Sequence, residues 1–159
     1  MTVKREPMTP KGYERLIKEI EQFKHVDRPA NIKAIEEARG HGDLSENADY
    51  DSAKQEQGLI QARLLMAEDR LARAEIIDPK TLSGTAVMFG AHVTIVDTES
   101  EDEFHYQLTS SYEADVKLNL ISIESPIGKA LIGKEEGDEA LVQAPNGSRT
   151  FAITKVEYK

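Results

Sequence analysis

The chain has 159 residues, and its formal net charge of −9 at pH 7 argues against a protein that binds nucleic acid by neutralising phosphates along its whole surface. It contains no cysteine, which excludes disulfides, thiolate metal ligands and a thiol nucleophile. The polar segment 1–10 lacks a signal-peptide pattern and no stretch reaches membrane-spanning length, so we expect a cytoplasmic protein that contacts no membrane.

The first predicted element is a helix that begins at Thr9 and Pro10, where a capping residue precedes a proline. Its apolar stripe consists of Tyr13, Leu16, Ile20 and Phe23, and a second run follows with Ile32 and Ile35. Pro29 lies between the two runs. Because proline costs about 3 kcal/mol inside a helix, we expect a kink or a restart there, with Asp27 as a possible cap.

The second predicted helix carries the strongest periodic signal in the chain. Apolar residues recur at spacings of three and four, with one polar member: Tyr50, Ala53, Gln57, Ile60, Leu64, Ala67, Leu71 and Ala74. This heptad stripe is typical of a coiled-coil strand. The two helices are joined by the short segment 40–42, so the sequence predicts an antiparallel hairpin whose second strand has about 30 residues and a length of about 45 Å.

The predicted tip of the hairpin, at about residues 41–50, is acidic. Asp43 and Glu46 lie three residues apart, and no lysine or arginine occurs in segment 40–53. One interpretation is that segment 43–46 forms a capping box for the second helix. The other is that the two carboxylates share a metal ion, although Mg²⁺ would need further ligands from a partner, since two carboxylates leave most of its coordination sphere open.

Basic residues flank the acidic tip. Arg39 precedes it and Lys54 follows it. Exposed charges of this kind often do no more than solvate a helix face. Alternatively, the two side chains are placed to hold a nucleic-acid strand whose scissile phosphate lies at the tip.

The second half of the chain has a different composition, with short β-branched runs separated by turns. We place a boundary near residue 80, which gives domains 1–79 and 80–159 and an α+β fold class. The predicted strands are 85–89, 92–96, 104–108, 120–123, 140–143 and 150–156. Pro145-Asn146-Gly147 predicts a hairpin turn, and Ser125-Pro126 opens a short helix that ends at Gly133.

Three separated stretches carry a family resemblance. They are GDLSENADY (42–50), MTPKGYERL (8–16), and NLIS (119–122) followed by SPIGKALIGK (125–134). Together they resemble bacterial Gre-type transcript cleavage factors of the GreA kind. The resemblance covers essentially the whole chain and implies an FKBP-like fold for the second half.

The resemblance implies a specific function. Such factors bind backtracked RNA polymerase and enter its secondary channel, where the nascent RNA 3′ end is extruded. Carried over by position, Asp43 and Glu46 are the catalytic acids, and they help to hold Mg²⁺ at the active site of the polymerase. Arg39 and Lys54 match basic positions near the extruded RNA.

The resemblance also implies a docking function for the second half. We expect it to bind the rim helices at the channel entrance through residues around one loop and one short helix: Ser122, Ser125, Pro126 and Ile127. The chain would then act as a monomer and would be no enzyme itself, because it supplies acids in trans.

Three other interpretations remain. A Gre-like protein could occupy the channel and inhibit the polymerase without stimulating cleavage, although this chain keeps the acidic tip pattern. A prolyl isomerase is disfavoured because the chain has no tryptophan and few aromatic residues. A purely structural coiled coil would have no affinity for RNA polymerase.

Overall fold

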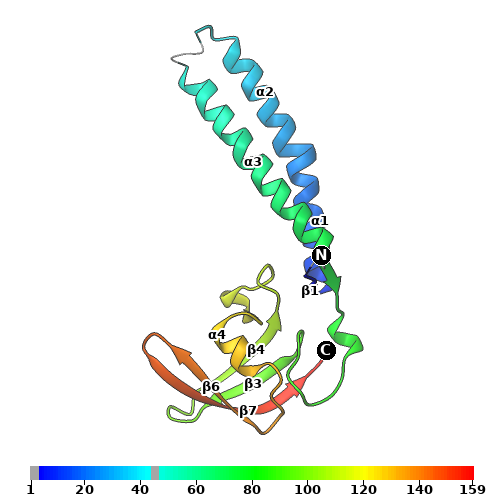
Figure 1. Ribbon diagram of the computed structural model, residues 1–159, viewed down its shortest axis with the longest axis vertical. Helices are drawn as coiled ribbons and strands as arrows, with labels where there is room; N and C mark the ends of the chain where they lie inside the picture. The colour runs from blue at the N-terminus through cyan, green and yellow to red at the C-terminus, as the bar shows by residue number, and fades with distance from the viewer. Residues whose placement is uncertain (1–3, 44–46) are drawn as a thin grey trace. The chain divides into compact units, whose positions relative to one another are not determined.

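The computed structural model describes residues 4–43 and 47–159, and its contacts divide the chain into two compact units (Figure 1). The first unit is built on Tyr13–Ala74. The second combines Arg5–Gly12 with Glu75–Lys159, so a short N-terminal segment belongs with the second half of the chain. Within the described residues, no helix combines the length and apolar character needed to cross a membrane.

The first unit is a helical hairpin. Its first strand consists of α1 (Pro10–Gln22), the π-helical turn η1 (Phe23–Asp27) and α2 (Arg28–Arg39), and its second strand is α3 (Ala48–Arg73). Figure 1 shows α2 and α3 side by side and antiparallel, as the heptad stripe predicts. At the start of α1, the Thr9 Oγ1 accepts a hydrogen bond from the Gly12 N–H at 3.1 Å, which confirms the predicted cap.

Two members of the predicted seam are exposed in the structure. The members of the buried seam are Leu16, Ile20, Asn31, Ile35 and Ala38 on the first strand, and Ala53, Ile60, Leu64 and Ala67 on α3. The prediction for Ile32 is wrong, since this side chain is 47% exposed and the neighbouring Asn31 is buried. Asn31 donates its Nδ2 hydrogen to the Ala53 carbonyl oxygen at 2.9 Å. Gln57 is also exposed, and it accepts a hydrogen bond from Lys54.

The π-helical turn explains the shifted seam. The Arg28 N–H donates to the Phe23 carbonyl oxygen, five residues back, so η1 holds more residues per turn than an α-helix. The expected interruption at Pro29 therefore takes the form of a wider turn just before the proline. Asp27 does not cap α2: its backbone is helical and its side chain accepts from Gln22 Nε2 at 3.1 Å.

The second unit is built on a five-stranded sheet with the order β5-β4-β3-β7-β6. The strands are β3 (His92–Asp97), β4 (Glu103–Thr109), β5 (Leu120–Ser122), β6 (Glu139–Ala144) and β7 (Gly147–Glu157). All neighbours are antiparallel except β4 and β5, and β6 and β7 form the predicted hairpin around Pro145-Asn146. The helix α4 (Pro126–Leu131) packs against β6, and Leu131 is fully buried in the core.

The predicted strand at 85–89 is wrong. This segment makes a single bridge, between Ala86 and Glu135. Val87 is nevertheless fully buried, and its backbone bonds to the loop after α4, from its N–H to the Lys134 carbonyl oxygen at 2.7 Å. This apolar segment thus forms its backbone hydrogen bonds with a loop instead of with a neighbouring strand.

The N-terminal segment joins the second unit through a small second sheet and a buried carboxylate. The strand β1 (Glu6–Met8) pairs with β2 (Ala74–Ile76), and Met8 is fully buried. Glu113 is 5% exposed, and it accepts hydrogen bonds from the Thr9 hydroxyl and from Ser110 Oγ, the latter at 2.9 Å. A side chain at Gly12 would overlap the Glu113 carboxylate, so the position requires glycine for the carboxylate to fit.

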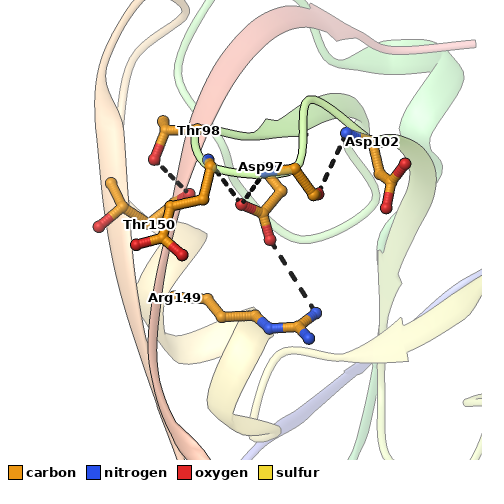
Figure 2. A network of polar contacts seen from close by, with 7 residues as sticks. Asp97, Thr98, Asp102, Arg149 and Thr150 are labelled. Atoms are coloured by element: carbon orange, nitrogen blue, oxygen red, sulfur yellow. Dashed lines mark hydrogen bonds and ion pairs between the residues drawn. The ribbon is translucent and has the colours of Figure 1, made fainter.

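The acidic connection after β3 is a structured turn (Figure 2). Asp97 is 5% exposed, and its Oδ1 accepts from the N–H groups of Glu99 at 2.9 Å and Ser100 at 3.2 Å. These backbone hydrogen bonds hold the pKa of Asp97 below its usual value. Arg149 lies on the other side of the carboxylate, with its Nη1 4.0 Å from Oδ2.

Candidate functional site

The tip of the hairpin begins with a tightly bonded helix end. The Gly40 N–H bonds to the Glu36 and Glu37 carbonyl oxygens at 3.2 and 3.1 Å, and the His41 N–H bonds to the Ala38 carbonyl oxygen at 3.1 Å. Gly42 has φ of 102°, a value that favours glycine strongly. The chain therefore leaves α2 in a defined direction before it reaches Asp43.

Asn47 connects the two helices behind the tip. Its Oδ1 accepts from the Tyr50 N–H at 3.0 Å and so caps α3, while its Nδ2 donates to the Ala38 carbonyl oxygen at 2.6 Å, at the end of α2. The sequence analysis missed this residue, although asparagine three residues before the first seam position is a recognisable cap signal. An amide is required here, because one group must accept while the other donates.

Asp43 is exposed and lies four residues before the actual cap of α3. The interpretation of Asp43 as the helix cap is therefore wrong. Glu46, the second predicted acid, lies outside the described residues, and its assignment stays a prediction.

Further acidic groups surround the tip. Asp49 and Asp51 occupy the first turn of α3, where the helix dipole favours negative charge. His41 Nδ1 lies 3.6 Å from Asp49 Oδ2, and both side chains are mostly exposed. A hollow of about 400 Å³ is lined by His41, Asp43, Asn47, Ala48 and Asp49.

The donor set at the tip fits magnesium in part. Carboxylate oxygens are the protein ligands that Mg²⁺ prefers, and Asp43 presents one to solvent. Across residues 4–43 and 47–159, however, no group of three histidine or acidic side chains is arranged to hold a metal ion. A Mg²⁺ site shared by Asp43 and Glu46 therefore stays a prediction.

The two predicted basic residues both lie on the hairpin near its tip. Arg39 is the last residue of α2 and is exposed. Lys54 is exposed on the second turn of α3, and its Nζ donates to Gln57 Oε1 at 2.8 Å. Both cations face solvent, where a polyanion can reach them.

The predicted docking residues form one turn of the second unit. Ser125 caps α4, accepting from the Gly128 N–H at 3.0 Å and donating to the Ser122 carbonyl oxygen at 2.6 Å. Pro126 is exposed, whereas Ile127 is half-buried and packs on the core. Of these side chains, Pro126 presents the most surface, and the two serines shape the turn that presents it.

These features define a protein of two parts: a helical hairpin with an acidic tip, and a β-rich unit with a short capped helix. Two family models match it. Residues 6–76 match "Transcription elongation factor, N-terminal", and residues 82–158 match "Transcription elongation factor, GreA/GreB, C-term".

Individual relatives agree with the family models. The chain is 52% identical over 157 residues to the transcription elongation factor GreA of Hyphomonas neptunium, covering 99% of this chain and 100% of the relative. It is 50% identical over 152 residues to GreA of Phenylobacterium zucineum, covering 96% and 97%. The chain therefore belongs to the GreA/GreB family of transcription elongation factors.

Two solved structures are also similar. The crystal structure of GreA factor homolog 1 (Gfh1) of Thermus thermophilus has 31% identity and a TM-score of 0.45, with 97% of this chain and 99% of that chain covered. The elongation factor GreA/GreB from Nitrosomonas europaea has 24% identity and a TM-score of 0.43, with 97% and 100% covered.

Proposed function

We propose that this protein binds backtracked bacterial RNA polymerase, extends its hairpin into the secondary channel, and stimulates cleavage of the nascent RNA 3′ end so that elongation resumes. Membership of the elongation factor family supports a partnership with RNA polymerase. In this proposal the protein contributes groups to the active site of the polymerase.

The observation that carries the proposal is the position of Asp43. Its carboxylate is exposed at the end of a long two-helix arm, beyond a glycine of positive φ, and it is not the cap of α3. An exposed carboxylate at the end of such an arm can act on a molecule outside the chain, which supports the proposal. Asn47 supports the same view, because it fixes both helix ends behind the acid.

In this proposal Asp43 and Glu46 hold a Mg²⁺ ion jointly with ligands of the polymerase. When bound, such an ion lowers the pKa of a bound water and stabilises charge on the transferring phosphate. The residues of this chain supply negative charge and oxygen donors at the end of a narrow arm. They supply them only while the arm is inserted, which confines stimulation to complexes whose channel is open to it.

Arg39 and Lys54 are proposed to hold the extruded RNA. Each carries a cation on the exposed surface near the tip, on different helices. Phosphate contacts of this kind position a strand without reading its sequence. Removal of either charge should therefore weaken cleavage on all RNA sequences alike.

The turn around Ser122 is proposed to dock on the rim helices of the channel. The turn is rigid, since Ser111 Oγ bonds to Ser122 Oγ at 2.9 Å and to Glu124 Oε2 at 3.0 Å, and Ser125 caps the helix that follows. Pro126 is exposed on it. A rigid surface loses little conformational entropy on binding.

The test is RNA cleavage by a stalled, backtracked polymerase with and without this protein. A shortened RNA that the polymerase then extends is the expected result. Occupation of the channel with no increase in cleavage would instead identify an inhibitor, and absence of binding would contradict the proposal altogether.

A further inference from the structure

An open groove runs along the hairpin between α2 and α3, which lie side by side in Figure 1. It has a volume of about 580 Å³. It is lined by Asp27, Ala30, Asn31, Ala34, Glu37, Ala38, His41, Asp49, Ser52, Ala53, Glu56 and Ile60. The groove follows α2 and the first half of α3, in the part of the hairpin nearest the tip. The function proposed above does not use it.

The floor of the groove is made of small side chains. Ala30, Ala34 and Ala38 recur every four residues on α2 and so share one face of that helix. Ser52 and Ala53 face them from α3. Since the distance between packed helices is set by the side chains at the contact, a floor of alanines admits close approach of a third helix or an extended segment.

The rim of the groove is acidic. Asp27, Glu37, Asp49 and Glu56 line it, and the lining contains no lysine or arginine. Within residues 4–43 and 47–159, neither Glu37 nor Glu56 forms an ion pair with a basic side chain. The groove therefore presents uncompensated negative charge on both helices.

This charge excludes two occupants. Phosphates are repelled from an acid-lined groove, so RNA and DNA do not fit it. A second copy of the chain also carries a net charge of −9, which opposes association between copies.

We infer that the groove binds a basic protein segment, carrying lysine or arginine beside small apolar residues, on the wall of the polymerase channel that the hairpin enters. The inference rests on the proposed function and adds a protein contact to it. The acids attract and orient the basic side chains, while the alanine floor provides apolar contact.

The seam beneath the groove explains why such a contact would matter. Near the tip the buried seam combines Ile35 with Asn31, Ala38 and Ala53, and these last three bury little apolar surface compared with Leu16 or Leu64 nearer the other end. A bound segment would therefore stabilise the part of the hairpin with the weakest packing. Its expected signature is slower amide hydrogen exchange in α2 and the first half of α3 when the polymerase is bound.

The first experiment maps the occupant. The chain has no cysteine, so Ala34→Cys in the full chain can be labelled uniquely with a short thiol-reactive photo-crosslinker. Bound to backtracked polymerase, it should crosslink to a polymerase peptide rich in lysine or arginine. Leu65→Cys is the control, since Leu65 is 57% exposed on α3 and lies outside the groove lining. Crosslinks from position 34 to RNA, to a second copy of this chain, or to no molecule would overturn the inference.

The second experiment tests the charge. Glu37→Lys with Glu56→Lys should weaken binding to the polymerase on the order of tenfold at low salt, and less at high salt. The matched control is Glu36→Lys with Glu14→Lys, which changes the net charge equally on exposed helical positions outside the groove lining. Equal affinity of the two double variants would contradict the inference while leaving the proposed function intact. If the unmodified protein does not bind the polymerase, the proposed function itself fails.

Discussion

The β-rich unit and the hairpin are stabilised in different ways. The β-rich unit has a contiguous core in which side chains from the sheet, α4 and the segment around Val87 pack together. The hairpin has one buried stripe on each strand, and near its tip the stripe includes Asn31, Ala38 and Ala53. Packing therefore defines the β-rich unit, while hydrogen bonds at Gly40 and Asn47 define the tip. Substitutions should consequently have large effects on stability in the first region and small ones in the second.

The largest expected effect comes from a pair of glycine substitutions. Gly128 is buried in α4, and a Cβ there would overlap the Ser122 carbonyl oxygen and lie 2.9 Å from the Ile123 Cα. Gly128→Ala should therefore lower the free energy of unfolding of the β-rich unit by about 3 kcal/mol. Chemical denaturation followed by amide NMR signals of the sheet measures this.

The counterpart in the hairpin is Gly58→Ala on α3. A Cβ at this position meets no atom within 4 Å, so the substitution should stabilise the hairpin by about 1 kcal/mol. Equal effects of the two substitutions would contradict the contrast.

A smaller effect is expected at Asn47. Asn47→Ala removes the cap of α3 and the bond to the Ala38 carbonyl oxygen, at a cost of about 1–2 kcal/mol. Hydrogen exchange of the amides in 48–52 should become faster, while exchange in the sheet stays the same. Asn47→Asp keeps an acceptor for the Tyr50 N–H but cannot donate to the Ala38 carbonyl oxygen. Its stability should therefore lie between that of the unmodified protein and that of Asn47→Ala. If Asn47→Asp matches the unmodified protein, the connection to α2 contributes nothing.

The smallest effect concerns Asp97 and is dependent on pH. Because backbone N–H groups lower its pKa in the folded state, its ionised form stabilises the fold above the unfolded value of about 3.9, and this contribution is lost as pH falls through the folded pKa. Asp97→Asn should therefore reduce stability at pH 7, and the difference should shrink below about pH 4. Urea denaturation at pH 7 and pH 3 measures it. A difference that does not change with pH would assign the effect to packing.

Much of the architecture is predictable because it depends on local periodicity. In α3 the spacing correctly indicates the buried Ala53, Ile60, Leu64 and Ala67, although Gln57 of the same stripe is exposed, and in β3 the alternation indicates the buried face. The burial of Asn31 in place of Ile32 is not predictable in this way. The π-helical turn shifts the phase of the buried stripe and has no periodic signal of its own. The contact between Thr9 and Glu113 joins residues 104 apart in sequence, and no local pattern indicates it.

The candidate site was also predicted from the sequence only in part. The sequence indicates an acidic tip and a capping box at segment 43–46, but it did not lead us to Asn47, although asparagine caps helices about as well as aspartate does. The three-dimensional structure identifies Asn47 as the cap of α3, because its side chain bonds to both the Tyr50 N–H and the Ala38 carbonyl oxygen. The cap of α3 and the predicted acid Asp43 are therefore different residues.

The most direct measurement is cleavage of backtracked RNA by polymerase with the double variant Asp43→Asn and Glu46→Gln. Both changes keep side-chain size and remove charge, and a carboxamide binds Mg²⁺ far more weakly than a carboxylate does. Because Asp43 does not cap α3, the hairpin should fold and bind the polymerase as before, while stimulated cleavage falls by about 100-fold or more. Helicity and polymerase affinity are measured on the same preparations. Unchanged cleavage with normal binding would contradict the assignment of the tip carboxylates.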